Sequence, residues 1–439
     1  MAFRLVALLG GIVSISQANY FESIKKYELV HITVEQNAAT APLLKFNAFS
    51  QDFVVELDRN DDIVPADIRH TNGNPTVEAG LEQIITHRTE SCHYFANVLS
   101  HKEQTPSQGA ASLCGKRGIR ATLHIGSDTL YVQPAAVYLD TEREHHDFDD
   151  EYIVYYERDV DHPEINYGDS MPAPLEKLRA NVESQIEAQV NGERRRLVYN
   201  SGLSRVEVLM ILDPTIITYF QGKHTNWYEA LTAQMLDTIN TVSSIYSNNG
   251  GSGWPSDINS ITVNVVEFLL VFQWSGNYLS LEPAERCSDY TSCSIDGSAW
   301  LNKIQAWIDN YKASERTEFD NVMVMHNINL GGNTAGWGWI GTMCSGGWSA
   351  SDNYMIWENF DILYRTVAHE LGHNFGMRHD QDTPCGIDGG IMGYGSGPDS
   401  FSSCSQSSIS TEFSDNNGLT CLSDAPPSSR RTNYNPNTG

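Results

Sequence analysis

Three histidines and a glutamate lie at regular spacing in the run from Ala368 to Asp380. His369 and His373 are four residues apart, so on a helix their imidazoles share one face, one turn apart. That separation suits two ligands of a single zinc ion. Glu370 directly follows the first histidine and is placed to accept a proton from a zinc-activated water as a general base. The spacing therefore predicts a helix that carries both a metal site and a catalytic base.

A third histidine completes the predicted metal site. Gly376 allows the left-handed turn that ends the helix and turns the chain back, and His379 follows that turn. Three protein ligands leave the fourth position of the zinc to water, which is typical of catalytic sites, whereas structural zinc is closed by four protein ligands. The residues therefore predict one catalytic zinc.

The elements that must position these residues follow from hydrophobic periodicity. Strands alternate with helices over residues 197–424, which predicts an α/β fold with a mixed sheet. The predicted strands are Val206–Leu212, Ile261–Phe272 and Val322–Met325, and the predicted helices are Asn226–Tyr246, Ser298–Tyr311 and Asp361–Phe375. The last of these helices carries the first two histidines.

Residues 19–196 differ in character, because strand-like runs alternate there with turns. The runs begin at Phe53, Ala121, Leu130 and Ile153 and predict a β-rich domain. A polar segment near residues 175–190 has helical character. The basic triplet Arg194–Arg196 follows, and we interpret it as a processing site between two domains, with a solvated linker as the alternative.

The two ends and the composition set the protein's surroundings. Arg4, an apolar run and Ser16-Gln17-Ala18 are typical of a secretory signal peptide, and the run is too short to cross about 30 Å of hydrocarbon. We therefore expect a secreted, extracellular protein without a membrane span. The net charge of −27 on 439 residues excludes nucleic acid as a main partner. We expect a monomer.

The H-E-x-x-H-x-x-G-x-x-H motif that begins at His369 resembles that of metzincin zinc metalloproteases. Met392 follows where the Met-turn of those enzymes would lie beneath the zinc, although a methionine is by default core filler. Asp380, directly after the third histidine, points to the adamalysin (reprolysin) family, and the run from Gly341 to Cys344 resembles its ADAM-TS branch. The resemblance covers residues 203–424 and extends more weakly to residues 19–196.

The resemblance implies an α/β (α+β) metzincin catalytic domain with a mixed, mostly parallel sheet and an active-site helix, preceded by a β-rich pro-domain. We accordingly divide the chain into a signal peptide (1–18), a pro-domain (19–196), a reprolysin-type metalloprotease domain (197–424) and a disordered tail (425–439). It also implies four disulfides that use all eight cysteines: Cys92–Cys114, Cys287–Cys293, Cys344–Cys421 and Cys385–Cys404.

Two further sites are implied by the resemblance. A structural calcium ion would be held by Glu207, Asp320, the carbonyl of Cys421 and Asp424, which are the hard oxygen ligands that Ca²⁺ prefers. Without the resemblance, Glu207 and Asp320 are simply surface charges, so both interpretations stay open. The segment Gly331–Ile340 resembles the edge strand to which an extended substrate would add through backbone hydrogen bonds.

The chain departs from the family pattern at two places. The usual latency device is a pro-domain cysteine that ligates the zinc, yet no cysteine lies between Cys114 and the arginine triplet. Cys92 and Cys114 fit a disulfide better than a pair of metal ligands. Tyr394, two residues after Met392, resembles the tyrosine that acts as a fifth zinc ligand in astacins, but a packed turn tyrosine is the favoured alternative.

Together these features predict a secreted, zinc-dependent endopeptidase of the metalloendopeptidase class, made as a zymogen, that hydrolyses peptide bonds of extracellular proteins. Its expected partners are peptide or protein substrates and its own pro-domain. The alternative is a non-catalytic, toxin-like binding module that keeps the metzincin fold. Because degenerate members of such a family usually lose the glutamate or a histidine, the presence of all four residues favours the enzyme.

Overall fold

The computed structural model describes residues 22–37, 40–63, 69–72, 92–100, 107–114, 118–135, 151–161, 171–172, 204–247, 258, 260–271, 297–315, 319–328, 330, 334–345, 348–355, 360–386, 390–394, 399–415 and 419–423. The expected signal peptide, arginine triplet, helix near residues 175–190, Cys287–Cys293 pair, Asp424 and C-terminal tail all lie outside the described residues.

The first sheet is antiparallel throughout and has nine described strands, in the order β1-β10-β9-β8-β7-β6-β4-β3-β2. Its strands are β1 (Glu28–His31), β2 (Thr33–Asn37), β3 (Thr40–Ala48), β4 (Gln51–Arg59), β6 (His93–Ser100), β7 (Gln108–Ser112), β8 (Arg120–Ile125), β9 (Asp128–Pro134) and β10 (Glu151–Tyr156). The four strand-like runs predicted in this region fall within β4, β8, β9 and β10.

The second sheet is mixed and has seven described strands, in the order β11-β15-β16-β14-β12-β13-β5. Its strands are β5 (Arg69–Asn72), β11 (Met171–Pro172), β12 (Ser204–Leu212), β13 (Ile261–Leu270), β14 (Asn321–His326), β15 (Gly336–Ile340) and β16 (Ala350–Tyr354). Neighbouring strands are parallel except β15 and β16, which are antiparallel. The predicted strands Val206–Leu212 and Val322–Met325 lie within β12 and β14, and the predicted strand Ile261–Phe272 corresponds to β13, which ends earlier, at Leu270.

Both edges of the second sheet come from the N-terminal part of the chain. β5 pairs with β13 at one edge, and β11 pairs with β15 at the other. The expected boundary at residue 196 therefore does not separate the strands of the two sheets completely. A strand that adds at an edge satisfies backbone groups which would otherwise be open to another chain.

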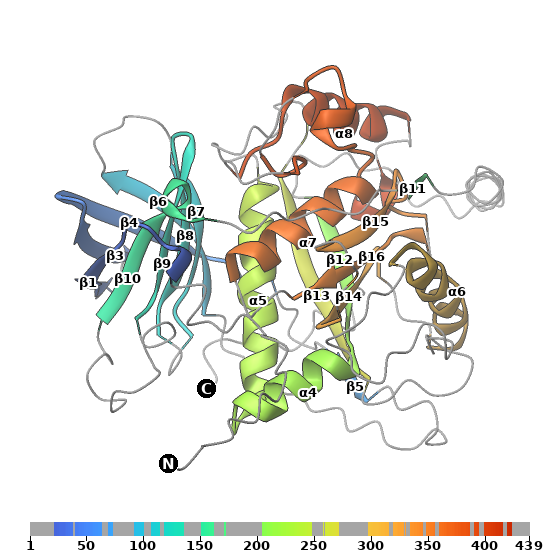
Figure 1. The fold of residues 1–439 in the computed structure, drawn as a ribbon, viewed down its shortest axis with the longest axis horizontal. Helices are drawn as coiled ribbons and strands as arrows, with labels where there is room; N and C mark the ends of the chain where they lie inside the picture. The colour runs from blue at the N-terminus through green and yellow to red at the C-terminus, as the bar shows by residue number, and fades with distance from the viewer. Residues whose placement is uncertain are drawn as a thin grey trace, which may run out of the picture.

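The helices lie on both faces of the second sheet (Figure 1). They are α4 (Pro214–Lys223), α5 (Trp227–Ile245), α6 (Gly297–Glu315), α7 (Phe360–Asn374) and α8 (Ser403–Asp415), with short 3-10 turns η2 (Glu157–Asp159), η4 (Asp380–Asp382) and η5 (Thr420–Ser423). Helices α5 and α7 lie between the two sheets, and α6 covers the opposite face of the second sheet. The three predicted helices correspond to α5, α6 and α7.

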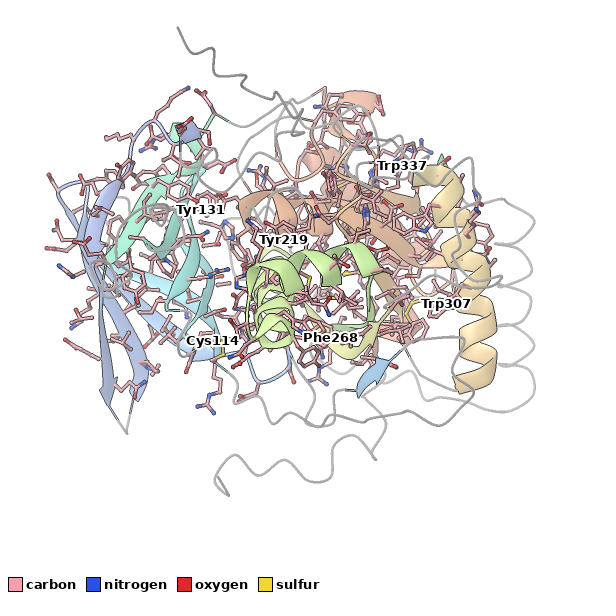
Figure 2. All side chains as sticks on the ribbon, turned by 60° about the horizontal axis from the view of Figure 1, so that its bottom comes forward. Cys114, Tyr131, Tyr219, Phe268, Trp307 and Trp337 are labelled. Carbon is pink, nitrogen blue, oxygen red and sulfur yellow. A yellow bond between two sulfur atoms is a disulfide. The ribbon has the colours of Figure 1, made fainter. Side chains whose placement is uncertain are left out.

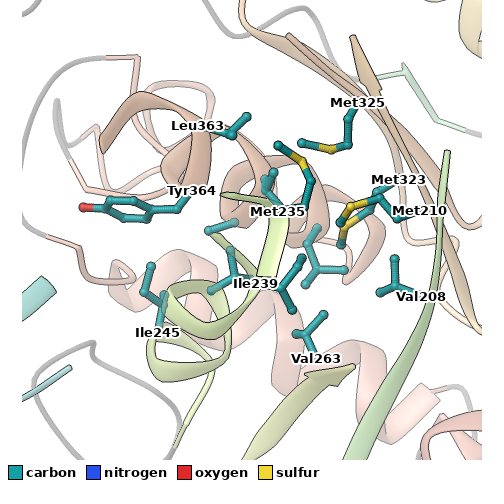
Figure 3. Close-up of a cluster of buried hydrophobic side chains, with 14 of the residues drawn as sticks. Val208, Met210, Met235, Ile239, Ile245, Val263, Met323, Met325, Leu363 and Tyr364 are labelled. Atoms are coloured by element: carbon teal, nitrogen blue, oxygen red, sulfur yellow. The ribbon is translucent and has the colours of Figure 1, made fainter. Parts of the chain in front are cut away.

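Alternation along β12 explains these layers. Val208 and Met210 point into the core shared with α5 and α7, whereas Leu209 and Ile211 point into the core under α6. Because every second side chain of a strand faces the same side, a strand buried on both faces is apolar along its whole length. Figure 3 shows Met210 among buried side chains of α5, α7 and the neighbouring strands.

The first sheet contacts α5 and α7 through buried polar groups as well as apolar ones. The Asn240 amide of α5 donates to the carbonyls of Tyr94 (3.2 Å) and Ala111 (3.1 Å). The hydroxyl of Tyr131 on β9 lies 2.6 Å from that of Tyr364 on α7. Figure 2 shows Tyr131 on the side of the first sheet that faces the helices. Helix α7, the predicted active-site helix, is therefore held from both sides.

Among the described residues, no helix is long and apolar enough to cross a membrane.

Candidate functional site

The three predicted ligand histidines converge in the structure. Helix α7 carries His369 and His373 on one face, and His379 comes back toward them just after the helix ends. Nε2 of His379 lies 3.0 Å from Nε2 of His369 and 3.1 Å from Nε2 of His373. All three side chains are at most 1% exposed. Three ring nitrogens thus face one common point, as one metal ion would require.

The turn after α7 brings His379 back. Gly376 has a φ of 84°, in the left-handed region that glycine adopts at little cost. Its N–H donates to the His373 carbonyl (2.8 Å), and the Met377 N–H donates to the Gly372 carbonyl (3.0 Å). These two bonds satisfy carbonyls at the helix end, as in a Schellman motif. The predicted role of Gly376 as the turn residue is confirmed.

Each histidine has an oxygen atom beside its second ring nitrogen. Nδ1 of His369 donates to the Ile391 carbonyl (2.6 Å), and Nδ1 of His373 donates to the Met377 carbonyl (2.8 Å). A carbonyl only accepts, so in these two rings the hydrogen is on Nδ1 and the lone pair is on Nε2. This is the tautomer that offers Nε2 to a metal.

The electrostatics of the cluster favour neutral rings. Burial, followed by the neighbouring imidazoles, holds the pKa of His369 well below its usual value. Burial and then His379 lower the pKa of His373 to about 3. Neutral imidazole is the form that binds metals. Three buried imidazole nitrogens fit zinc and do not fit a hard cation such as calcium.

Glu370 lies on α7 beside the histidines and is 1% exposed. Burial, and secondarily the proximity of the Asp352 carboxyl on β16, holds the pKa of the Glu370 carboxyl well above the usual range. Neither carboxylate oxygen has a hydrogen-bond partner among the described residues. A carboxylate in this setting has a raised proton affinity, which suits a group that takes up a proton near neutral pH.

Two glycines of β15 make room for this glutamate. A Cβ at Gly336 would lie 2.8 Å from Oε1 of Glu370, and a Cβ at Gly338 would lie 3.0 Å from Oε2. The edge strand therefore runs directly past the carboxylate. These glycines were not predicted as site residues. Alternate glycines in a strand were the available sequence signal, because they mark a close approach of another group.

Met392 packs directly under the helix that carries the ligands. Its side chain is fully buried, and a Cβ at Gly372 would lie only 2.5 Å from its sulfur. The contact joins the segment after the third histidine to the face of α7 between the first two. Met392 is therefore where a Met-turn residue is expected.

Tyr394 contacts the third histidine from the far side of its ring. Its hydroxyl lies 2.5 Å from Nδ1 of His379, whereas the Nε2 of that histidine faces the other two rings. The tyrosine ring also packs against Ala335 and Ile362. Of the two roles considered for Tyr394, these contacts favour the packed tyrosine over the fifth ligand.

Three of the four implied disulfides are present among the described residues: Cys92–Cys114, Cys344–Cys421 and Cys385–Cys404. The Cys344–Cys421 bond joins the turn after β15 to η5 near the end of the described chain. His93 lies beside the first pair, with its Nε2 3.8 Å from the sulfur of Cys114. Because disulfide sulfurs are not thiolates, this group is not a zinc site.

The implied calcium ligands are partly brought together. The Glu207 N–H donates to Oδ2 of Asp320 (2.9 Å), and the Asp320 N–H donates to the Glu207 carbonyl (2.8 Å). The turn η5, which contains Cys421, packs beside β12, the strand of Glu207. Glu207 is only 8% exposed, so the alternative interpretation of this residue as a surface charge is wrong.

The predicted substrate-binding edge, Gly331–Ile340, contains β15, and its first three residues lie outside the described part of the chain. The inner side of β15 pairs with β16, and its outer side pairs with β11, where Met171 lies opposite Trp339 and Pro172 opposite Ile340. A segment from the N-terminal part of the chain thus occupies part of the edge to which an extended peptide would add.

Comparisons with known proteins agree with this geometry. Residues 287–426, which include all the predicted zinc ligands, match the family described as "Reprolysin (M12B) family zinc metalloprotease". The chain is 24% identical to human disintegrin and metalloproteinase domain-containing protein 9 over 96% of its length and 47% of the relative's. It is also 24% identical to human disintegrin and metalloproteinase domain-containing protein 19, over 87% of its length and 36% of the relative's. The chain thus spans less than half the length of these curated relatives.

Proposed function

Because this chain belongs to the reprolysin family of zinc metalloproteases, we propose that it is a secreted endopeptidase that hydrolyses peptide bonds of extracellular proteins. The observation that carries the proposal is the convergence of three buried imidazoles beside the buried carboxyl of Glu370, whose pKa is raised. A purely structural zinc site would need a fourth protein ligand and no such base.

Each residue has a distinct role in the proposed reaction. His369, His373 and His379 would hold the metal through Nε2. Zinc, when bound, supplies Lewis-acid polarisation of the scissile carbonyl and makes an attacking water acidic. Glu370 takes the proton of that water on its carboxylate and later delivers it to the leaving amine. The backbone of β15 would align the peptide by adding it as a further strand.

The change Glu370→Gln tests this mechanism. Glutamine keeps the shape of the side chain but cannot accept the proton, so zinc content should be unchanged while kcat falls by a factor of about 100 or more. Zinc content by elemental analysis and cleavage of casein or gelatin measure the two effects on the processed protein. A variant that cleaves as well as the parent would contradict the mechanism. A parent that binds zinc but cleaves nothing would instead favour the non-catalytic binding module.

We further propose that residues 19–196 form the pro-domain and that Arg194–Arg196 is its processing site. The pairing of β11 with β15 supports this, because the N-terminal part then covers an edge that substrate needs. N-terminal sequencing of the secreted protein tests the cut. A first residue at or just after the triplet is expected, and an intact N-terminal region in fully active protein would contradict the proposal.

A structural calcium ion belongs to the same proposal. Glu207, Asp320, the Cys421 carbonyl and Asp424 would bind it, and the two hydrogen bonds between Glu207 and Asp320 support the assignment. Calcium bound only by the folded state raises its stability by mass action. Thermal unfolding with and without added calcium tests the site, and Asp320→Asn should abolish any difference.

A further inference from the structure

The Nδ1 atom of each histidine in the cluster lies against an oxygen atom. Two of these oxygens belong to the backbone and one belongs to a side chain. His369 and His373 use the backbone carbonyls of Ile391 and Met377. His379 uses the side-chain hydroxyl of Tyr394, at 2.5 Å from its Nδ1. Substitution cannot remove a backbone carbonyl. Tyr394 is therefore the partner among these three that a single change can remove.

The hydrogen of this contact can be assigned from the cluster itself. Nε2 of His379 points at the Nε2 atoms of the other two rings, so a metal there needs its lone pair. The ring hydrogen must then be on Nδ1, and the tyrosine oxygen accepts it. A hydroxyl that accepts from Nδ1 fixes both the tautomer and the rotation of the imidazole.

The position of Tyr394 is itself well determined. Its ring lies against that of His379, with centroids 4.3 Å apart, and packs on Ala335 and Ile362. The fully buried Met392, two residues earlier, is held against Gly372 of α7. One short segment therefore supplies the buried methionine under the ligand helix and the hydroxyl beside the third histidine.

A second oxygen near the same nitrogen belongs to Asp382. Its Oδ2 lies 3.6 Å from Nδ1 of His379, and its side chain is 63% exposed. The greater distance and the solvent around this carboxylate make its effect on the ring small. Asp382 thus provides a matched comparison for Tyr394 at the same atom.

We infer that Tyr394 is a positioning residue for His379, accepting a hydrogen bond from Nδ1 so that Nε2 faces the metal, and that it is not a fifth metal ligand. The inference rests on the proposed zinc site. Nδ1 and Nε2 project from different sides of the imidazole, so an oxygen in line with Nδ1 is on the side away from the metal position. Loss of such a partner weakens metal binding by about 10- to 100-fold in zinc proteins.

The change Tyr394→Phe tests the inference, because it keeps the packed ring and removes only the acceptor. Zinc affinity, measured by competition with a chromophoric chelator, should fall about 10-fold or more. Asp382→Asn should change it by less than about 3-fold. Thermal unfolding of the metal-free proteins checks that all variants fold. A Tyr394→Phe variant that folds and binds zinc like the parent overturns the inference.

Copper(II)-substituted protein separates the two roles of the tyrosine directly. A phenolate bound to copper gives a visible charge-transfer absorption, and a hydroxyl hydrogen-bonded to Nδ1 gives none. We expect no such band in the parent. A band that disappears in Tyr394→Phe would establish the fifth ligand and overturn the inference.

A ligand variant distinguishes failure of the inference from failure of the proposed function. His369→Ala should lose zinc far more severely than Tyr394→Phe. If His369→Ala binds zinc as tightly as the parent, the three-histidine site is wrong and both proposals fail. If only His369→Ala loses zinc, the site stands and the role of Tyr394 is refuted.

Discussion

At the scale of single residues, the candidate site depends on glycines that leave space as much as on the side chains that fill it. Gly336 and Gly338 leave the space into which the Glu370 carboxylate fits, and Gly372 leaves space for the Met392 sulfur. Any Cβ at these positions would come closer than van der Waals contact allows. The predicted ligands were therefore only part of the site.

The change Gly336→Ala should displace Glu370. The added Cβ would lie 2.8 Å from Oε1 of Glu370 and 2.8 Å from the Asp352 carbonyl. Because a catalytic group moved by about 1 Å can lose about 100-fold in rate, we expect a fall in kcat of that order. Zinc content should stay close to that of the parent. Steady-state kinetics and metal analysis measure both effects.

Gly222→Ala provides the matched control. Nothing lies within 4 Å of a Cβ at that position in α4, so kcat should be unchanged and stability should rise by about 0.5 kcal/mol. A Gly336→Ala enzyme as active as this control would show that the approach of β15 to Glu370 does not matter for the reaction.

At the scale of elements, the two halves of α7 have different partners. Its C-terminal half carries the histidines, while its N-terminal half contacts the first sheet through Tyr364 and Arg365. Arg365 pairs with Glu157 of η2 and lies 3.5 Å from Asp399, and all three side chains are about 6% exposed or less. The N-terminal part of the chain thus supports the helix that carries the candidate metal ligands.

The change Glu157→Gln should destabilise the protein strongly. It removes a buried charge that compensates Arg365, and breaking such a pair costs about 3 kcal/mol or more. Denaturant unfolding of the full chain measures the loss. Arg158→Gln is the control, because Arg158 is 62% exposed and its pair with Asp128 should contribute less than about 1 kcal/mol. Equal effects of the two changes would refute the structural role of the buried pair.

At the scale of the whole molecule, two sheets share one layer of helices, and the second sheet encloses buried polar groups as well as apolar ones. His326 of β14 is fully buried, lies against Trp300 and Tyr354, and has its Nε2 3.8 Å from Oδ1 of Asp352. Burial lowers the pKa of His326 to about 3 and raises the pKa of Asp352 well above its usual value. Both pKa shifts favour the uncharged forms, so His326 and Asp352 form a neutral pair.

This pair predicts how stability depends on pH. The unfolded histidine, with a pKa near 6.5, binds a proton that the folded one excludes until about pH 3. The contribution of His326 is therefore present above pH 6.5 and is lost as the pH falls. Relative to His326→Asn, the parent should lose about 2 kcal/mol of unfolding free energy between pH 7 and pH 5.

Urea unfolding of the metal-free parent and variant at both pH values measures this difference. Metal is removed so that its loss in acid does not contribute. If His326 and Asp352 instead form an ionised pair in the folded protein, the pKa of the histidine is raised and the difference has the opposite sign.

The sequence by itself determined the candidate ligands, the candidate general base, the turn at Gly376 and the six elements predicted around them. These depend on local spacing, because the 3.6-residue turn of a helix and the two-residue repeat of a strand place side chains on fixed faces. Local patterns did not reveal the short elements α4, α8 and β16, which have weaker periodicity and depend on the packing around them.

Only the tertiary structure decided which groups surround the candidate site. The pairing of β5 and β11 with the second sheet, the approach of Gly336 to Glu370 and the placement of Tyr394 beside Nδ1 of His379 are examples. The strand pairings and the Gly336 contact join residues far apart in the chain, and the tyrosine contact depends on how the segment after α7 folds back. Such contacts are selected by how the whole core packs, and no local pattern encodes that packing.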